Sequence, residues 1–151
     1  MAARLVARVT LPRELRSAGV GRRFVTSNLL TWLGDRECVY DAEMIVSEMI
    51  GNAVHHGMAP FVFLTVSLEA GMIGIDLGER SPELAETPSL PPLDAEDGRG
   101  LFIIEALSVA CGMRLTAGGK VVWATLGAGS AHVGLDMHAP GAPELPLVPL
   151  G

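Results

Sequence analysis

The stretch of sequence that decides the fold runs from Asp41 to Gly57 and reads DAEMIVSEMIGNAVHHG. At about 100° per residue it predicts one amphipathic helix, whose broad apolar arc consists of Ala42, Ile45, Val46, Met49, Ile50 and Ala53. A narrow polar stripe lies beside this arc and consists of Asp41, Glu48, Asn52 and His55, with His56 between stripe and arc. Glu48 and Asn52 are one turn apart, so both side chains can contact the same ligand.

The chemistry of these two side chains suits a nucleotide site. The amide oxygen of Asn52 is a suitable ligand for a hard cation such as Mg²⁺, which usually keeps waters and shares phosphate oxygens with a nucleotide. The Glu48 carboxylate is placed to orient or deprotonate a nucleophile. A surface helix with an ordinary polar face has the same pattern, so this motif alone does not decide between the two interpretations.

The composition limits the class of protein. The chain has 151 residues, 49% of them apolar and 19% charged, which is typical of one globular domain with a core. The net charge of −6 argues against direct nucleic-acid binding, which needs a basic face. Two cysteines, Cys38 and Cys111, are too few for a disulfide framework. We find no signal peptide and no apolar run of membrane-spanning length, and therefore expect a cytoplasmic protein without membrane contact.

The order of predicted elements is β-α-α-β-β-loop-α-β-β. Strands are expected at 5–11, 61–68, 72–77, 113–116 and 121–126, and helices at 13–33, 41–57 and 101–109. Tight turns are expected at Ala70-Gly71 and Gly118-Gly119, and Gly57 is a suitable residue to follow a helix end. This order predicts an α+β fold, a two-layer α/β sandwich with a mainly antiparallel sheet and three helices on one face.

The segment 79–97 is predicted to be a loop. It contains four prolines and six carboxylates, namely Glu79, Glu83, Glu86, Asp94, Glu96 and Asp97. A loop of this length is usually functional, typically a lid over a site, and a solvated loop is the simpler alternative.

Two further motifs contain candidate ligand-binding residues. Asp76 and Gly78 end a strand, where a desolvated carboxylate can accept a hydrogen bond from an exocyclic amine such as adenine N6 and glycine lets a flat ring approach. An ordinary turn aspartate gives the same pattern. The segment from Gly98 to Leu101, Gly-Arg-Gly-Leu, opens a helix whose free N–H groups and dipole favour phosphate. It has neither the lysine of a Walker A loop nor the third glycine of a Rossmann fingerprint.

Three motifs together resemble a known superfamily. In this order and spacing, the N, G1 and G2 boxes of the GHKL ATPase/kinase superfamily are similar to Glu48-x-x-x-Asn52-Ala-x-x-His56, Asp76-x-Gly78 and Gly98-x-Gly100-Leu101. Over residues 4–127 the chain is similar to the short, single-domain anti-sigma-factor serine kinases of that superfamily. The chain departs from the pattern in two places: Arg80 replaces a second G1 glycine, and Lys120, Val121 and Val122 stand where a Thr or Ser is common after the last glycine turn.

The resemblance implies a Bergerat fold that binds ATP and Mg²⁺. Asn52 would hold Mg²⁺ and Glu48 would act as the catalytic base or position a water. Asp76 would bind the adenine amine, with Gly78 beside it, and Gly98, Arg99 and Gly100 would approach the phosphates. His56 and Leu101 are the remaining cofactor-binding residues that the boxes imply.

The implied partners are an anti-anti-sigma (STAS-type) protein, phosphorylated on a serine, and a sigma factor that the same protein sequesters, with a homodimer as a further expectation. A nucleotide-dependent regulator without kinase activity is the main alternative. A histidine-kinase catalytic module and a non-nucleotide structural domain are weaker ones. Residues 1–127 are expected to form the ATP-binding domain, and 128–151, rich in Pro and Gly, a flexible tail.

Overall fold

A computed structural model describes residues 3–33, 36–80 and 102–128. Its elements, in chain order, are β1 (Leu5–Pro12), α1 (Ser17–Leu33), α2 (Glu37–His56), β2 (Phe61–Glu69), β3 (Met72–Arg80), a helical segment at 102–107, β4 (Ala110–Thr116) and β5 (Gly119–Gly127). All four strand pairs are antiparallel, in the order β1-β2-β3-β5-β4. The predicted α+β sandwich is confirmed.

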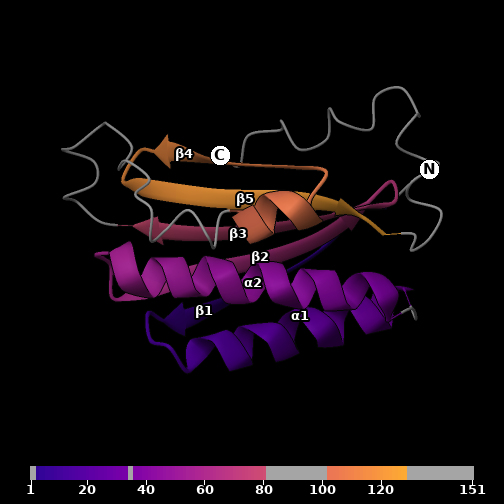
Figure 1. The fold of residues 1–151 in the computed structure, drawn as a ribbon, viewed down its shortest axis with the longest axis horizontal. Helices are drawn as coiled ribbons and strands as arrows, with labels where there is room; N and C mark the ends of the chain where they lie inside the picture. The colour runs from indigo at the N-terminus through magenta and orange to yellow at the C-terminus, as the bar shows by residue number, and fades with distance from the viewer. Residues whose placement is uncertain (1–2, 34–35, 81–101, 129–151) are drawn as a thin grey trace.

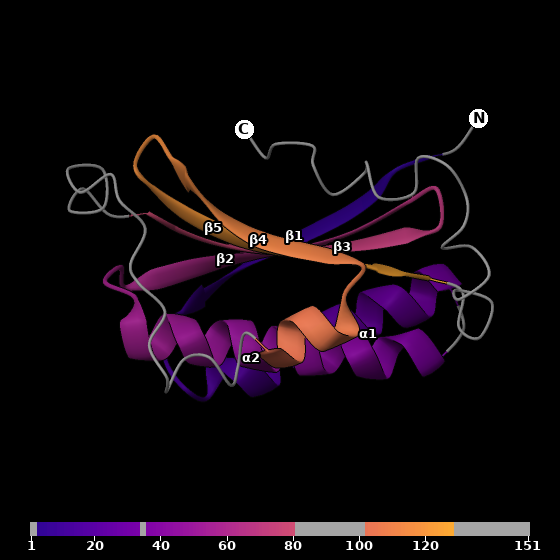
Figure 2. The ribbon, with the colours of Figure 1, turned by 45° about the horizontal axis from the view of Figure 1, so that its top comes forward.

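The helices cover one face of the sheet. Figures 1 and 2 show α2 along the middle of this helical layer, with α1 on one flank and residues 102–107 on the other. The core lies between the two layers and consists chiefly of fully buried side chains from β2, β3 and α2, among them Val62, Leu64, Val66, Ile73, Ile75, Ile45, Val46 and Ile50.

Alternation along β3 sets which side chains reach this core. Ile73, Ile75, Leu77 and Glu79 are buried on the helical face, whereas the residues between them are half-buried on the other face. Residues paired across neighbouring strands share a face of the sheet. Lys120 in β5 lies opposite Glu79 and is therefore also on the helical face. Each strand residue therefore belongs either to the helical face or to the open face of the sheet.

Close contact between α1 and α2 depends on a glycine. A Cβ on Gly21 would lie 2.7 Å from Ile50 Cδ1 and 3.1 Å from Val46 Cγ1. The sequence shows Gly21 only as a weak point in a helix, and the structure shows that its missing side chain lets the two helices pack together.

Several element ends differ from the predictions. α1 begins at Ser17 rather than at residue 13, and α2 begins at Glu37 rather than at residue 41. The expected loop at 79–97 is wrong at its start, because β3 continues through Glu79 and Arg80. The β4–β5 turn occupies 117–118, so Gly119 already belongs to β5.

The β2–β3 turn at Ala70-Gly71 is confirmed. Both residues have positive φ, 52° and 77°, as a tight hairpin turn of the primed type requires. Ala128, the first residue of the predicted tail, is buried and donates its N–H to Gly71 O at 2.8 Å. The rest of that tail and the segment 81–101 lie outside the described residues.

Candidate functional site

Helix α2 places Glu48 and Asn52 on the flank that faces away from α1. The flank toward α1 is marked by Arg22 Nη1, which donates to Ser47 Oγ at 2.9 Å, and by Thr26, which donates to Glu43. Glu48 and Asn52 lie roughly 100° and 140° around the helix from Ser47. Both are half-buried. The predicted pair is therefore on one stripe, on the flank of α2 away from α1. Figures 1 and 2 show the helix at 102–107 on that side of α2.

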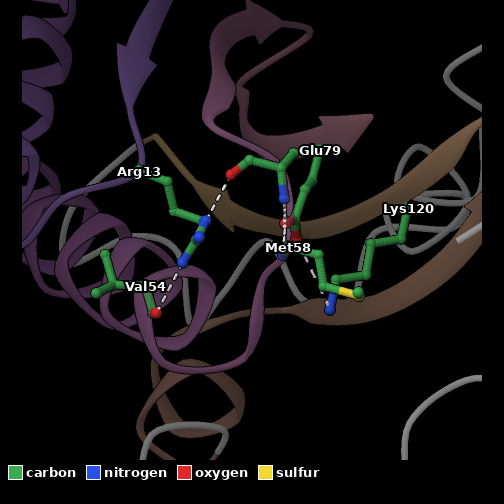
Figure 3. A network of polar contacts seen from close by, with 6 residues as sticks. Arg13, Val54, Met58, Glu79 and Lys120 are labelled. Carbon is green, nitrogen blue, oxygen red and sulfur yellow. Dashed lines mark hydrogen bonds and ion pairs between the residues drawn. The ribbon is translucent and has the colours of Figure 1, made fainter. Parts of the chain in front are cut away.

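A buried carboxylate lies at the C-terminal end of the same helix. The side chain of Glu79, in β3, is 4% exposed, and its Oε1 accepts hydrogen bonds from the N–H of Met58 at 2.7 Å and of Ala59 at 3.1 Å. Figure 3 shows this carboxylate between the connection that follows α2 and the side chain of Lys120 on β5. Lys120 Nζ is 3.9 Å from Glu79 Oε2, and its side chain is 10% exposed.

Arg13 donates hydrogen bonds to backbone carbonyl groups at the end of α2 and in the connection that follows it. Its guanidinium donates to Val54 O at 3.0 Å and to Ala59 O, and its N–H donates to Pro60 O at 2.9 Å (Figure 3). The last carbonyl groups of a helix have no donor inside the helix. The Arg13 guanidinium supplies such a donor at the end of α2. A cation and an anion thus fix one short connection, and with it the end of the helix that contains Asn52.

Gly57 makes room for Glu79. A Cβ at this position would lie 2.4 Å from Ala53 O, 2.4 Å from Glu79 Oε1 and 2.9 Å from Arg13 Cδ. The helix ends at Gly57 as predicted, but with φ −81° and ψ 164°, so the residue is not left-handed. Space, rather than backbone freedom, requires glycine here.

The structure does not bring Asp76 and Gly78 to the Asn52 side of the sheet. Asp76 pairs with Thr65 on β2 and Trp123 on β5, and its side chain is on the open face, because its neighbours along β3 are the ones directed into the core. Gly78 belongs to the same face. The helices and these two residues are on opposite sides of the sheet.

Charge and burial compete at Asp76. Burial raises the pKa of the Asp76 carboxyl to about 6, against the lowering effect of Arg114 and, more weakly, of Arg4 and Arg8. A pocket of about 390 Å³ is lined by Asp76, Gly78 and Arg8, and Glu79 and Lys120 also line it. Among the described residues, this carboxylate is the one with the strongly raised pKa, and its side chain is directed to the open face of the sheet.

The remaining predicted residues are distributed unevenly. His56 is exposed in the last turn of α2, on the helix that contains Glu48 and Asn52. The phosphate-binding segment from Gly98 to Leu101 lies outside the described residues. Within 3–33, 36–80 and 102–128, no group of three or more His, Cys, Asp or Glu side chains could hold a metal ion. An amide oxygen such as that of Asn52, completed by phosphate oxygens and waters, is still a donor set that suits Mg²⁺.

Glu79 is the buried carboxylate beside α2 that the sequence analysis does not single out. The signal was present: apolar residues at 73, 75 and 77 alternate, and continuing the alternation puts residue 79, not residue 76, on the core face. Pro82 and the nearby carboxylates, by contrast, favour a loop that begins at Glu79. Its burial instead depends on the hydrogen bonds described above.

Comparisons with known proteins agree with this architecture. The family model of the histidine kinase-like ATPase domain matches residues 11–126. Among solved structures, the RsbU and RsbW domains of Rv1364c from Mycobacterium tuberculosis are similar, with 23% identity and a TM-score of 0.55 over 80% of this chain and 32% of that one. The chain thus spans about a third of the length of that structure. No curated protein matches the chain in sequence.

The comparisons confirm the superfamily predicted from the three motifs. The matched family has the fold expected from them, and the similar structure has the same arrangement of sheet and helices. In the described part of the chain, no helix is long and apolar enough to cross a membrane. Because the family model covers 116 of 151 residues (11 to 126), the chain belongs to the histidine kinase-like ATPase domain family, the GHKL superfamily.

Proposed function

We propose that this chain is an ATP-binding protein serine kinase and anti-sigma factor, with the nucleotide on the helical side of the sheet. The observation that carries the proposal is the half-buried pair of Glu48 and Asn52 on the free flank of α2, in a chain of the histidine kinase-like ATPase family. Phosphoryl transfer needs mainly positioning and charge neutralisation, and this sparse set of groups can supply both.

Each residue has a distinct role in this proposal. Asn52 holds Mg²⁺, which when bound neutralises charge on the phosphate oxygens. Glu48 positions or deprotonates the attacking serine hydroxyl. The glycines and arginine at 98–100, with Leu101, approach the phosphates, as their sequence predicts.

Glu79 takes the role that the sequence first suggested for Asp76. It is an acidic residue at the end of a core strand, directed to the helical face, beside the end of α2. Asp76 has the same chemistry on the wrong face of the sheet for a ligand that also contacts Asn52. We therefore assign the recognition of the exocyclic amine to Glu79, and leave Asp76 and Gly78 without a role in base binding.

The proposed partners follow from the resemblance and from the RsbW domain in the similar structure. The acceptor is a serine on an anti-anti-sigma (STAS-type) protein, and the protein sequesters a sigma factor when that partner is phosphorylated. Action in the cytoplasm and as a homodimer belongs to the same proposal.

A regulator that binds nucleotide without transferring phosphate is the second candidate. Glu79 is already hydrogen-bonded to the backbone through Oε1, which favours a modified base site. Retention of Glu48 favours the kinase, because a protein that only binds ATP needs no base.

Titration calorimetry and a transfer assay test the two candidates. We expect Mg-ATP to bind the wild type and to bind Asn52→Ala at least tenfold more weakly, about 1.4 kcal/mol. Asn28→Ala on α1, where the side chain donates to Phe24 O, is the matched control and should bind as the wild type does. Glu48→Ala should keep ATP binding and lose phosphate transfer to a STAS-type protein.

The outcomes separate the candidates clearly. Binding without transfer by the wild type would leave the regulator as the function. Equal ATP affinity for Asn52→Ala and the wild type would remove Asn52 from the metal site. Absence of ATP binding by the wild type would overturn both candidates.

A further inference from the structure

Glu79 and Lys120 form a buried pair of opposite charges on the helical face. They lie directly opposite each other on β3 and β5, and both are buried, at 4% and 8% exposure. Neither is used by the predicted phosphate or metal chemistry. Burial removes both charged groups from water, which is unfavourable unless each group has a partner.

The distance between the two groups leaves both able to bind a third. Glu79 Oε2 and Lys120 Nζ are 3.9 Å apart, which is beyond the range of a hydrogen bond. Within the described residues neither atom has a hydrogen bond, whereas Glu79 Oε1 already accepts two from Met58 and Ala59. The pair therefore presents one acceptor oxygen and one ammonium donor side by side.

This donor and acceptor pattern matches one purine better than the other. Adenine has an amine donor at N6 and an acceptor at N1 on neighbouring positions of its ring. Glu79 Oε2 can accept from N6 while Lys120 Nζ donates to N1. Guanine has two donors, at N1 and N2, which a carboxylate binds best with both oxygens. Here the two backbone N–H groups occupy Oε1.

We propose that Lys120 is a second base-reading residue, which donates to N1 of adenine beside the Glu79 carboxylate and so selects adenine over guanine. This inference rests on the proposed function, since it needs a nucleotide on the helical face. It goes further by naming how the base is discriminated. Lys120, the first of the three residues in the stretch where a Thr or Ser is common, then contributes to specificity for the base.

Nucleotide analogues test the inference on the unaltered protein. Titration calorimetry with 1-deaza-ATP, in which a C–H replaces N1, should give an affinity at least tenfold weaker than with ATP, about 1.4 kcal/mol. The matched control is 7-deaza-ATP, in which a C–H replaces N7. The Glu79–Lys120 pair does not face N7, so this analogue should bind within about twofold of ATP. GTP should bind at least tenfold more weakly than ATP.

A variant then assigns the effect to the lysine. Lys120→Met keeps the length of the side chain and removes the donor, so it should bind ATP and 1-deaza-ATP equally and weakly. If the wild type binds ATP and 1-deaza-ATP equally well, the inference is overturned while the proposed function stands. If the wild type binds no ATP, both fall. Because the analogue comparison uses the wild type, misfolding of the variant cannot mask the answer.

Discussion

Replacing Gly57 by alanine should destabilise the protein strongly, although the backbone at this residue is unstrained. The new Cβ would lie 2.4 Å from Ala53 O, which cannot retreat because the N–H of Gly57 donates to it at 2.7 Å. It would also lie 2.4 Å from Glu79 Oε1. Moving that oxygen weakens its two hydrogen bonds to backbone N–H groups.

The magnitude follows from these contacts. Overpacking costs roughly 1–3 kcal/mol, and hydrogen bonds to a charged group contribute about 1.5–3 kcal/mol each. Partial loss of both bonds plus the strain gives an expected decrease of about 3 kcal/mol in the free energy of unfolding. For a domain of this size that lowers Tm by roughly 10 °C.

Urea denaturation and a thermal melt measure this decrease, with Gly51→Ala as the matched control. Gly51 lies inside α2, and among the described residues a Cβ there would meet no atom outside the backbone of its own helix within 4 Å. The same chemical change should therefore raise the free energy of unfolding by up to about 1 kcal/mol, since alanine is the better helix former. If Gly57→Ala is as stable as the wild type, Glu79 does not pack against Gly57 as described and the reasoning is refuted.

Two further perturbations test the helix contact and the open face. Gly21→Ala should lower the free energy of unfolding by about 1 kcal/mol in urea denaturation, because contacts with Ile50 and Val46 outweigh the gain in helix propensity; a more stable variant would contradict the close approach of α1. The pKa of Asp76 is raised to about 6 in the folded protein from 3.8, so the folded state binds more protons than the unfolded state and stability falls as pH rises from about 4 to about 6. The free energy of unfolding of Asp76→Asn, measured against pH, should not show that fall. When the curves of the variant and the wild type are aligned below pH 4, the variant should be on the order of 3 kcal/mol more stable above pH 7. Parallel curves for the two proteins would refute the burial of the charge.

The sequence predicted those parts of the fold that depend on local periodicity. The helix with Glu48 and Asn52 is amphipathic over its whole length, and the turn at Ala70-Gly71 joins two strands of alternating pattern. Both are determined within a few residues, so their burial and register follow from the sequence. The histidine kinase-like ATPase family predicted from the motifs is the family to which the chain belongs.

The parts that the sequence did not predict depend on contacts between distant residues. Glu79 is buried with its carboxylate bound by N–H groups 20 and 21 positions earlier and with Lys120 opposite, and none of these contacts is visible locally. Without them, a carboxylate near prolines is expected in a loop. The residue type of Asp76 shows its chemistry, but only the alternation along β3 shows that its side chain lies on the open face.

The length of the Glu79 side chain connects its structural role with the proposed base recognition. The G1 box of the resembled superfamily has an aspartate, and glutamate is one methylene longer. Gly57 accommodates the longer side chain by having no Cβ where Oε1 lies, and the backbone N–H groups of Met58 and Ala59 fix that oxygen. Only Oε2 then remains for a ligand, beside Lys120. A glutamate that is held at one oxygen in this way presents a single acceptor, and a single acceptor beside a donor is what adenine requires.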